Sequence, residues 1–402
     1  MASDRPAMAE SAQARPARAA FYNDPAVRSV VYQVVLCAVV AFLVWGAIGN
    51  AVDNLRRANI ASGFGFWDNT AGFDISQTLI SYTSDASTYG RAFWVGLLNT
   101  LLVAVLGIVL ATIIGFLVGI GRLSSNWLVA KFCAAYVETI RNIPLLLQLL
   151  FWYNAVLKTL PGIRDSVHLF GGGFLNNRGL FLPQPQFGAG FGVVLVALAA
   201  GIAGALIYRY RARRRQMQTG VQAPVLWVSL ALILGLPLAA LIATGFPVSF
   251  IFPEMGRFNI RGGVEVLPEF VALLLGLSIY TAAFIAEVVR AGIRAVPHGQ
   301  TEAAYSLGLR PGPALRFIVI PQAMRVIVPP LTSQYLNLTK NSSLAVAIGY
   351  PDLVQIFTGT VLNQTGQAVE VVAITMAVYL TISLVTSFAM NLYNRRVALV
   401  ER

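Results

Sequence analysis

The feature that most constrains this chain is a series of uninterrupted apolar runs, each about as long as a membrane is thick. A helix needs about 20 apolar residues to cross the hydrocarbon core of a bilayer. Backbone polar groups in lipid must be satisfied within their own segment, so each run predicts a helix. The sequence therefore predicts an all-α polytopic membrane protein with about eight transmembrane helices. The predicted spans are 29–49, 93–120, 131–157, 188–208, 223–243, 268–289, 325–348 and 369–392.

Composition supports the same class of protein. Hydrophobic residues make up 57% of the chain and charged residues 11%, against about a quarter charged in soluble domains. The net charge of +12 is compatible with nucleic acid or with a membrane surface. The basic residues lie beside the apolar runs, where a polytopic protein needs them. We therefore expect contact with membrane lipid, for which the arginine-rich segment 209–222 is a candidate, and no nucleic-acid partner.

The distribution of Lys and Arg predicts an orientation. With the N-terminus in the cytoplasm, 19 of the 29 basic residues fall in inside segments and 8 in outside segments; Arg141 and Lys340 fall within spans. An excess of positive charge inside is the usual arrangement. The transmembrane domain is predicted at 92–394. Predicted cytoplasmic segments are 1–28, 209–222, 294–323 and 395–402, and predicted outside loops are 50–91 and 158–187, whose role the sequence leaves open.

One long polar segment, 294–330, is patterned as two short helices. Glu302 falls early in the first helix, where a carboxylate suits the positive end of the helix dipole. Gly308 is expected to end that helix, because glycine tolerates a left-handed turn. A second helix is predicted at about 312–320, stopping at Pro321. Two short helices meeting at a glycine predict a docking surface for another protein.

This segment resembles the EAA loop of ABC-importer permeases. The similarity lies in a triplet, a glycine four residues later and a proline further on: Glu302-Ala303-Ala304, Gly308 and Ile320-Pro321. The run from Leu331 to Leu353, with Lys340-Asn341-Ser342-Ser343 inside it, is similar to the polar amino-acid permeases, most of all the general L-amino-acid (Aap/Bzt-type) group. The resemblance covers about 93–396 and implies the ABC type I importer permease fold, with the EAA loop as a coupling helix.

The resemblance also implies partners and a place in the cell. Two ATPase subunits would receive the coupling residues Glu302, Ala303, Ala304, Gly308 and Pro321. A second permease is implied, in a sibling heterodimer rather than a homodimer, together with a periplasmic binding protein that delivers L-amino acids. The resemblance places the protein in the bacterial inner membrane, with both termini in the cytoplasm. None of the three lysines follows a glycine, so the chain has no phosphate-binding P-loop. We expect no enzyme activity and no cofactor in this chain, with ATP and Mg²⁺ bound by the partner ATPase.

Four charged residues lie toward the predicted cytoplasmic ends of two spans: Glu138 and Arg141 in the third, Glu287 and Arg290 in the sixth. Charges inside a bilayer cost at least about 2.5–3.5 kcal/mol each at a helix centre, so they invite an explanation. We predict that they pair across helices, Glu138 with Arg290 and Arg141 with Glu287, near the translocation path. The alternative is that they pair locally or reach the interface and serve only packing.

Lys340 is the second intramembrane cation to explain. Its neighbours form a polar face that a lipid-exposed helix would avoid, and they are Asn337, Asn341, Ser342 and Ser343. A cation among amides and hydroxyls can receive a carboxylate, which every amino acid carries. We predict that this face lines the pathway or binds substrate. In the alternative, Lys340 reaches out of the membrane or binds carbonyls of a partner subunit.

No metal-ligand cluster or nucleophile–base pair is recognisable, so no metal or catalytic residue is predicted, and a membrane-embedded enzyme would lack its catalytic set. The rival function is an ion-coupled secondary amino-acid transporter or channel that acts without an ATPase. That class predicts internal repeats and carboxylates near mid-bilayer. We see no repeat, and the carboxylates lie near the cytoplasmic edge. The sequence leaves open which amino acids are carried and whether this chain holds a complete substrate site.

Overall fold

The computed structural model describes residues 25–57, 63–256 and 259–397. The chain forms two compact units: residues 1–64 with 365–370, and residues 65–364 with 371–402. The first unit contains the long helix α1 (Pro25–Arg57), which includes the predicted first span. Apolar side chains along this helix are exposed, as lipid contact requires. Most of the predicted terminal segments 1–28 and 395–402 lies outside the described residues.

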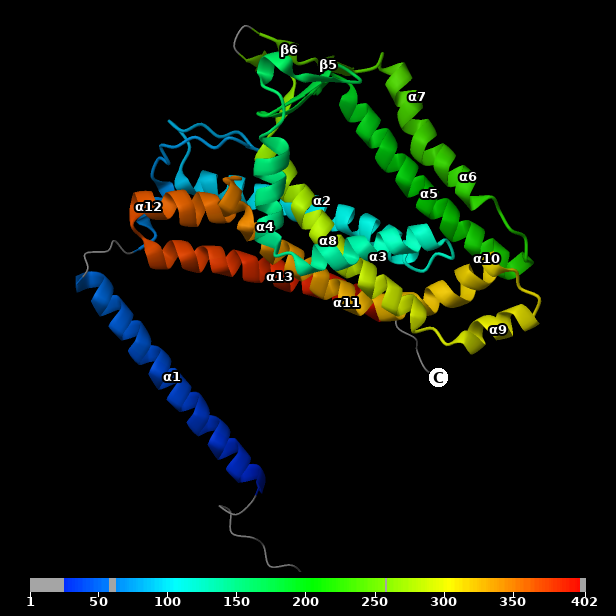
Figure 1. Cartoon of the computed structure of the whole chain (residues 1–402), viewed down its shortest axis with the longest axis horizontal. Helices are drawn as coiled ribbons and strands as arrows, with labels where there is room; N and C mark the ends of the chain where they lie inside the picture. The colour runs from blue at the N-terminus through cyan, green and yellow to red at the C-terminus, as the bar shows by residue number, and fades with distance from the viewer. Residues whose placement is uncertain (1–24, 58–62, 257–258, 398–402) are drawn as a thin grey trace, which may run out of the picture. The chain divides into compact units, whose positions relative to one another are not determined.

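The second unit is built mainly of helices (Figure 1). Across the described residues, seven helices are long and apolar enough to cross a membrane, or up to eight if one bent pair counts as a span. The prediction of about eight spans is confirmed. The main helices are α2 (Tyr89–Gly121), α3 (Trp127–Asn142), α4 (Leu145–Leu150), α5 (Phe191–Thr219), α6 (Val225–Leu230), α7 (Leu236–Ala243), α8 (Pro268–Arg294), α9 (His298–Ser306), α10 (Pro311–Ala314), α11 (Ile320–Asn341), α12 (Leu362–Thr365) and α13 (Ala368–Val397).

Helices α2 and α8 pack closely at the centre of this unit. Gly115 and Gly119 lie four residues apart on α2, a spacing typical of helices that approach each other closely. A Cβ atom added at Gly115 would lie 2.6 Å from Cβ of Ile285, and one added at Gly119 would lie 2.8 Å from the backbone oxygen of Ala286. Only glycine allows this contact, so the two positions set the distance between the helices.

Replacing Gly115 with leucine is expected to lower the melting temperature of the purified protein markedly. Forcing extra carbon atoms into a packed core costs about 1–3 kcal/mol, and here the first added atom already meets Ile285. Gly192 in α5 is the matched control, because nothing lies within 4 Å of a Cβ added there. Thermal unfolding in detergent compares the two variants. Equal melting temperatures would show that the α2–α8 contact does not depend on Gly115.

The predicted third span, 131–157, is broken. Helices α3 and α4 with its continuation η3 (Phe151–Leu157) meet at an angle of 106°. Pro144 follows Ile143 at the break, and a proline disfavours helical backbone in the residue before it. The side-chain Nε2 of Gln148 donates to the carbonyl oxygens of Ile140 and Ile143, both at 2.9 Å. The amide thereby satisfies backbone groups that the break leaves without helical partners.

The two loops on either side of α5–α7 form strands, which the all-α prediction did not include. Helix nevertheless dominates, as predicted. Each strand is only two to four residues long, too short to show a clear alternation of polar and apolar residues, and two of the pairings, β3 with β8 and β4 with β5, join segments far apart in the sequence. All pairings are antiparallel, in a four-stranded sheet of order β1-β2-β3-β8 and two two-stranded sheets. The strands are β1 (Val167–Leu169), β2 (Gly173–Asn176), β3 (Gly179–Leu182), β4 (Gln184–Phe187), β5 (Val248–Ile251), β6 (Glu254–Met255), β7 (Ile260–Arg261) and β8 (Val264–Val266).

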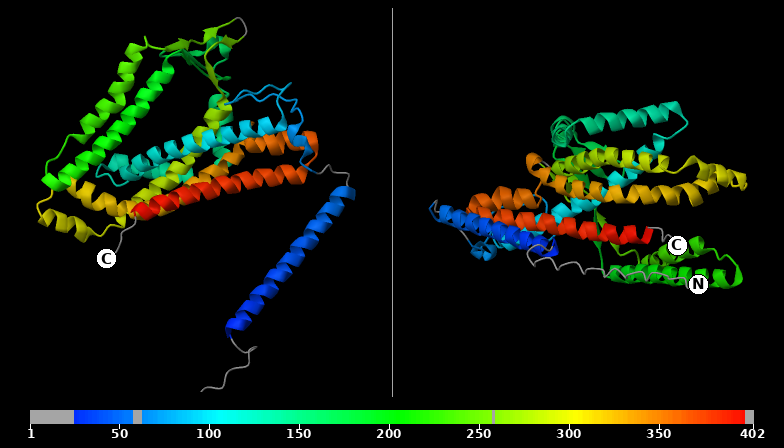
Figure 2. Two further views of the ribbon diagram at one scale, coloured as in Figure 1. Left: turned by 180° about the vertical axis from the view of Figure 1, so that it is seen from behind. Right: turned by 90° about the horizontal axis from the view of Figure 1, so that it is seen from below.

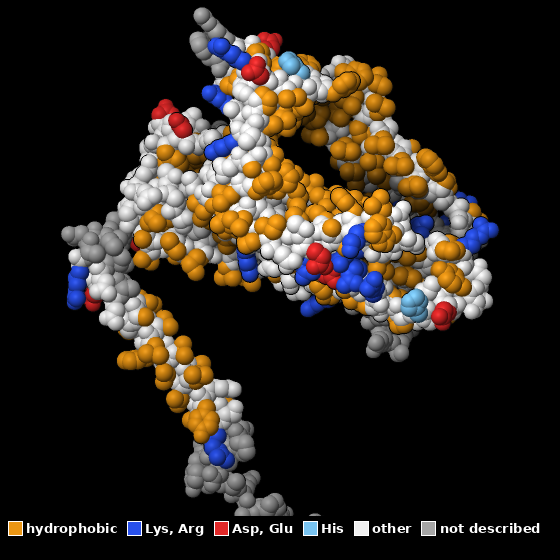
Figure 3. Space-filling view, in the orientation of Figure 1, with side chains coloured by type: hydrophobic (Ala, Val, Ile, Leu, Met, Phe, Trp, Pro, Cys, Tyr) orange, Lys and Arg blue, Asp and Glu red, His pale blue; other side chains and the backbone are white. Residues whose placement is uncertain are grey.

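Helix α5 extends well beyond the predicted span 188–208, because it continues through the arginine-rich segment to Thr219. Arginine is a good helix former, so the cluster ends the apolar run without ending the helix. The guanidinium of Arg214 lies 4.9 Å from the ring centre of Tyr210, one turn earlier. Figure 3 shows hydrophobic side chains along α5 to α7, consistent with contact with lipid.

Candidate functional site

The polar segment after α8 forms the first predicted short helix, α9 (His298–Ser306), which begins directly after Pro297. Gly308 ends it with φ +77°. The amide of Gly308 donates to the carbonyl of Tyr305 at 2.9 Å, and that of Leu309 to the carbonyl of Ala304 at 3.1 Å. These bonds satisfy the last carbonyls of the helix, as a glycine-terminated helix end does. The first predicted short helix and its end at Gly308 are confirmed.

The second predicted helix, 312–320, is wrong at its end. Helix α10 passes through the π-helical turn η6 (Leu315–Val319) directly into α11. Pro321 lies in the first turn of α11 and does not stop the helix. The wider turn makes the difference, because the amide of Ile320 bonds the carbonyl of Leu315, five residues back. The docking element, which we call the foot (residues 297–319), is therefore continuous with the helix that carries Lys340.

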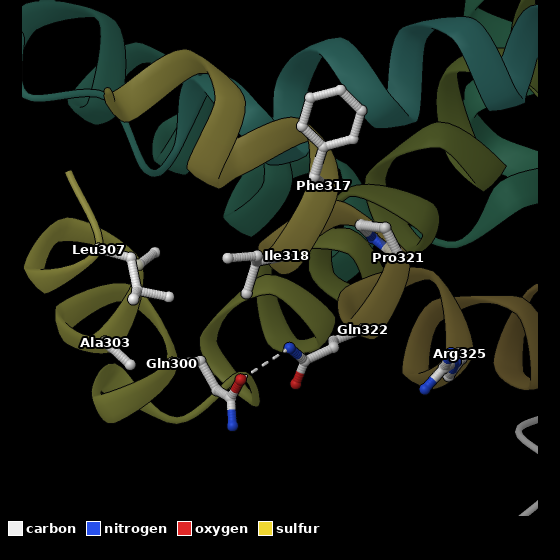
Figure 4. Close-up of a pocket in the computed structure, with 9 residues that line it drawn as sticks. Gln300, Ala303, Leu307, Phe317, Ile318, Pro321, Gln322 and Arg325 are labelled. Atoms are coloured by element: carbon white, nitrogen blue, oxygen red, sulfur yellow. Dashed lines mark hydrogen bonds between the residues drawn. The ribbon is translucent and has the colours of Figure 1, made fainter. Parts of the chain in front are cut away.

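A cavity of about 550 Å³ separates α9 from η6 and the start of α11 (Figure 4). Leu307 and Ile318 border it, and the side chains of Gln300 and Gln322 form a hydrogen bond of 3.2 Å along one edge. The predicted coupling residues divide into two sets. Ala303, Ala304 and Pro321 line the cavity, and Ala304 is fully buried. Glu302 and Gly308 are exposed.

Five charged residues gather where the C-terminal ends of α2 and α8 meet the last turns of α3. Arg122 follows the last residue of α2, and its side chain is only 13% exposed. It donates to a carboxylate oxygen of Glu287 and lies 3.8 Å from Glu138. Arg290 also donates to Glu287, three residues earlier on α8. Arg141 lies over the ring of Phe284, 5.1 Å from its centre.

This arrangement corrects the predicted pairs, which joined Glu138 to Arg290 and Arg141 to Glu287. Arg122 takes the central position instead, because the close contact of α2 with α8 brings the end of α2 beside Glu287. A cation there also suits the negative end of the α2 dipole. Arg122 is the residue that sequence reasoning missed. Its signal in the sequence is a basic residue directly after an apolar run, a pattern that by itself indicates only orientation.

Replacing Arg122 with glutamine is expected to destabilise the protein by about 1–3 kcal/mol, because Glu287 then keeps only Arg290 and Glu138 loses its ion pair. Arg141→Gln is the matched control: it removes the same charge from a side chain that contacts only an aromatic ring among the interactions described. Melting temperatures in detergent separate the two. A larger loss in Arg141→Gln would contradict the central position of Arg122.

Lys340 lies near the end of α11 and is exposed, as is Asn337 one turn earlier. Leu338 and Thr339 occupy the buried face of the same helix. Ser342 is also buried, and its hydroxyl donates to the carbonyl of Thr339 at 2.7 Å. The partly buried members of the predicted polar face are Asn341 and Ser343, and the Ser343 hydroxyl donates to the carbonyl of Lys340 at 2.7 Å. The structure thus brings together Lys340 and Asn337 but directs Ser342 away from them.

A second residue that sequence reasoning missed is Asp352, in the turn between two candidate spans. Its carboxylate is buried, accepting bonds from the amide of Gln355 at 2.8 Å and the hydroxyl of Tyr379 at 3.2 Å. Burial raises the pKa of Asp352 to about 7. In the same turn, the carbonyl of Pro351 accepts a bond of 2.8 Å from the side chain of Asn99. The bond from Asn99 fixes the turn to α2 and the bond from Tyr379 fixes it to α13. The only sequence signal was an acid beside a proline.

Apolar helices of membrane-spanning length, joined to a polar foot that continues into one of them, define a multi-span membrane subunit built to contact another protein. A family model described as "Binding-protein-dependent transport system inner membrane component" matches residues 111–399. The chain belongs to this family, whose members are inner-membrane parts of transport systems.

Three curated relatives match nearly the whole chain. The "General L-amino acid transport system permease protein AapQ" of Rhizobium johnstonii is 55% identical, covering 96% of both chains. The "Putative amino-acid ABC transporter permease protein YhdX" of Escherichia coli is 52% identical, covering 95% of this chain and 97% of the relative. The "Glutamate/glutamine/aspartate/asparagine transport system permease protein BztB" of Rhodobacter capsulatus is 45% identical, covering 94% and 96%.

Proposed function

We propose that this chain is the permease subunit of an ATP-binding-cassette importer that moves L-amino acids into the cytoplasm. The observation that carries the proposal is the foot: a short helix ended by Gly308 that leads through η6 into α11. A rigid connection of this kind can carry a displacement from the foot to the membrane. The names of the three relatives, all amino-acid permeases, support the substrate class.

The proposed complex contains a second, sibling permease, two ATPase subunits and a periplasmic binding protein. ATP and Mg²⁺ bind the ATPases, and this chain contributes no cofactor and no catalytic residue. Both termini lie in the cytoplasm, which places the foot beside the ATPases. Closure of the ATPases on ATP displaces the foot, with Glu302 and Gly308 transmitting the force. The movement of α11 then switches the pathway between inward- and outward-facing states.

Three further residue roles belong to this proposal. Lys340, with Asn337 on the same exposed face, receives the substrate carboxylate in the pathway. The charged cluster around Arg122 closes the inner end of the pathway, where its members join three helices. The other members of that cluster are Glu138, Arg141, Glu287 and Arg290.

Purification and reconstitution test the proposal. The chain, expressed with its operon partners, is expected to co-purify with two ATPases and a second permease. In liposomes that contain the complex, uptake of L-amino acids should require ATP and the binding protein. A panel of acidic, basic and neutral amino acids defines the specificity. Undiminished accumulation in liposomes that lack the ATPase would instead support an ion-coupled transporter.

A further inference from the structure

A second cavity, of about 370 Å³, lies at the end of α8 opposite the foot. Figure 2 shows the strands at this end of α8 and the foot at the other. Five separate segments line the cavity: the loop before α2, the end of the broken span, the turn between β2 and β3, the passage from β8 into α8, and the residue after η7. The lining residues used below are Tyr153, Lys158, Arg178, Glu265, Glu269 and Gly349.

The cavity carries two cations, Lys158 and Arg178, and two carboxylates, Glu265 and Glu269. Throughout the part of the chain that the structure describes, ion pairs within 4 Å join only residues at the other end of α8. The four charges around the cavity therefore face it without being paired to one another. Burial raises the pKa of Glu265, and the nearby Arg178 opposes that shift. Glu269 is half-buried and the other three side chains are exposed, so the four charges are open to a ligand that enters from outside.

Tyr153 holds one charge of each sign in place. Its hydroxyl donates to Oε1 of Glu269 at 2.7 Å, and Nζ of Lys158 lies 4.3 Å from the centre of its ring. A charged side chain fixed by a neighbour loses less freedom when a ligand binds. The arrangement is thus prepared for a ligand that carries both a negative and a positive group.

We propose that this cavity binds a free amino acid as its zwitterion, with the carboxylate near Lys158 and Arg178 and the ammonium group near Glu265 and Glu269. Because the cavity has two cations and two carboxylates, it can accept amino acids with neutral, acidic or basic side chains. An acidic side chain can share the two cations, and a basic side chain can share the two carboxylates. The volume lies at the lower end of the range of about 300–1,000 Å³ for small-molecule sites.

The position of the cavity suits an entry site, and this step rests on the proposed function. Gly349 borders the cavity and directly follows η7 (Ser342–Ile348), the continuation of α11. Seven residues of 3₁₀-helix span about 14 Å at roughly 2 Å per residue. An amino acid released at this end would therefore occupy the cavity before it reaches Lys340.

Equilibrium binding of radiolabelled L-glutamate, L-glutamine and L-arginine to the purified permease–ATPase complex, without binding protein, tests the proposal. We expect saturable binding of all three. Arg178→Gln should weaken L-glutamate binding about tenfold more than L-arginine binding, and Glu265→Gln should do the reverse. Arg164→Gln and Asp165→Asn are matched controls, because both residues are exposed in the same outer region but do not line the cavity. Both controls should bind all three amino acids as the unaltered complex does.

If these charges had only a structural role, both variants would lose the same amount of binding for all three amino acids. That result would overturn the proposed binding site. Unchanged binding in both variants would also overturn it, since the ligand would then bind elsewhere. If Arg178→Gln fails to assemble, Lys158→Gln provides the same comparison. The uptake assay distinguishes failure of the cavity proposal from failure of the proposed function. A complex that transports amino acids but binds them normally in the variants disproves only the cavity, whereas a complex that transports none disproves the proposed function.

Discussion

Replacing Gly308 with valine is expected to reduce ATP-driven amino-acid uptake about tenfold or more while leaving the permease folded. Gly308 has φ +77°, and no atom lies within 4 Å of an added Cβ. The penalty is therefore in the backbone alone, about 1–2 kcal/mol for an ordinary residue and more for a β-branched one. Relief of that strain reorients α9 relative to η6, so the foot meets the ATPase at the wrong angle.

Two further variants make this result specific. Gly308→Asn should retain more uptake than Gly308→Val, because asparagine tolerates the left-handed conformation. Gly312→Val is the matched control in the same foot, because a Cβ there also meets nothing within 4 Å but φ is not positive. Uptake by reconstituted complexes, together with the amount of co-purified ATPase, measures coupling. Equal uptake by the Gly308 and Gly312 valine variants would show that the turn geometry does not matter.

The sequence predicts well those elements whose cause is local. Apolar runs become helices because backbone N–H and C=O groups in lipid must form hydrogen bonds within their own segment. Helix α8 begins at Pro268, as predicted. The helix ended by Gly308 follows from capping chemistry contained within a few residues. The family resemblance rests on this segment and on the run from Leu331 to Leu353, and the family model confirms it.

The errors have causes that lie elsewhere in the chain. The partner of Glu287 depends on how closely α2 approaches α8, which Gly115 and Gly119 decide from a different span. Strand β8 pairs with β3 across more than eighty residues of sequence, so β8 is not recognisable from its neighbours in the sequence. From its neighbours in the sequence alone, Pro321 is predicted to end a helix. In the structure, a π-helical turn before Pro321 allows the helix to continue. Contacts between distant segments are needed to predict each of these features.

The parts of the candidate site also differ in whether their signals are local or come from distant segments. The first helix of the foot was predictable because the signals for its start and its end lie in one continuous segment. The outer cavity was not, because its charges come from three segments that only the folded chain brings together. The polar face around Lys340 was only partly predictable. Its polar composition can be read from the sequence, but the burial of Ser342 depends on which side of α11 packs inward.

Replacing Lys340 with methionine is expected to reduce uptake about tenfold to a hundredfold, while the complex still assembles. Hydrogen bonds to a charged group contribute about 1.5–3 kcal/mol, and the substrate carboxylate would lose such a bond. Methionine keeps the length of the side chain but not its charge. Lys340 is exposed on α11 and forms no ion pair among the described residues, so its removal leaves no buried carboxylate unpaired.

The control variants distinguish a substrate contact from a structural one. Lys340→Arg keeps the charge and should retain part of the uptake, whereas Lys131→Met removes an exposed lysine from α3 and should have no effect. A ligand contact also predicts a raised KM for uptake in the arginine variant, which a packing role does not. Because the outer cavity would fill before this site does, Lys340→Met should reduce uptake but leave binding of L-glutamate to the cavity intact. Normal uptake by Lys340→Met, with assembly shown by co-purification, would remove this lysine from the pathway.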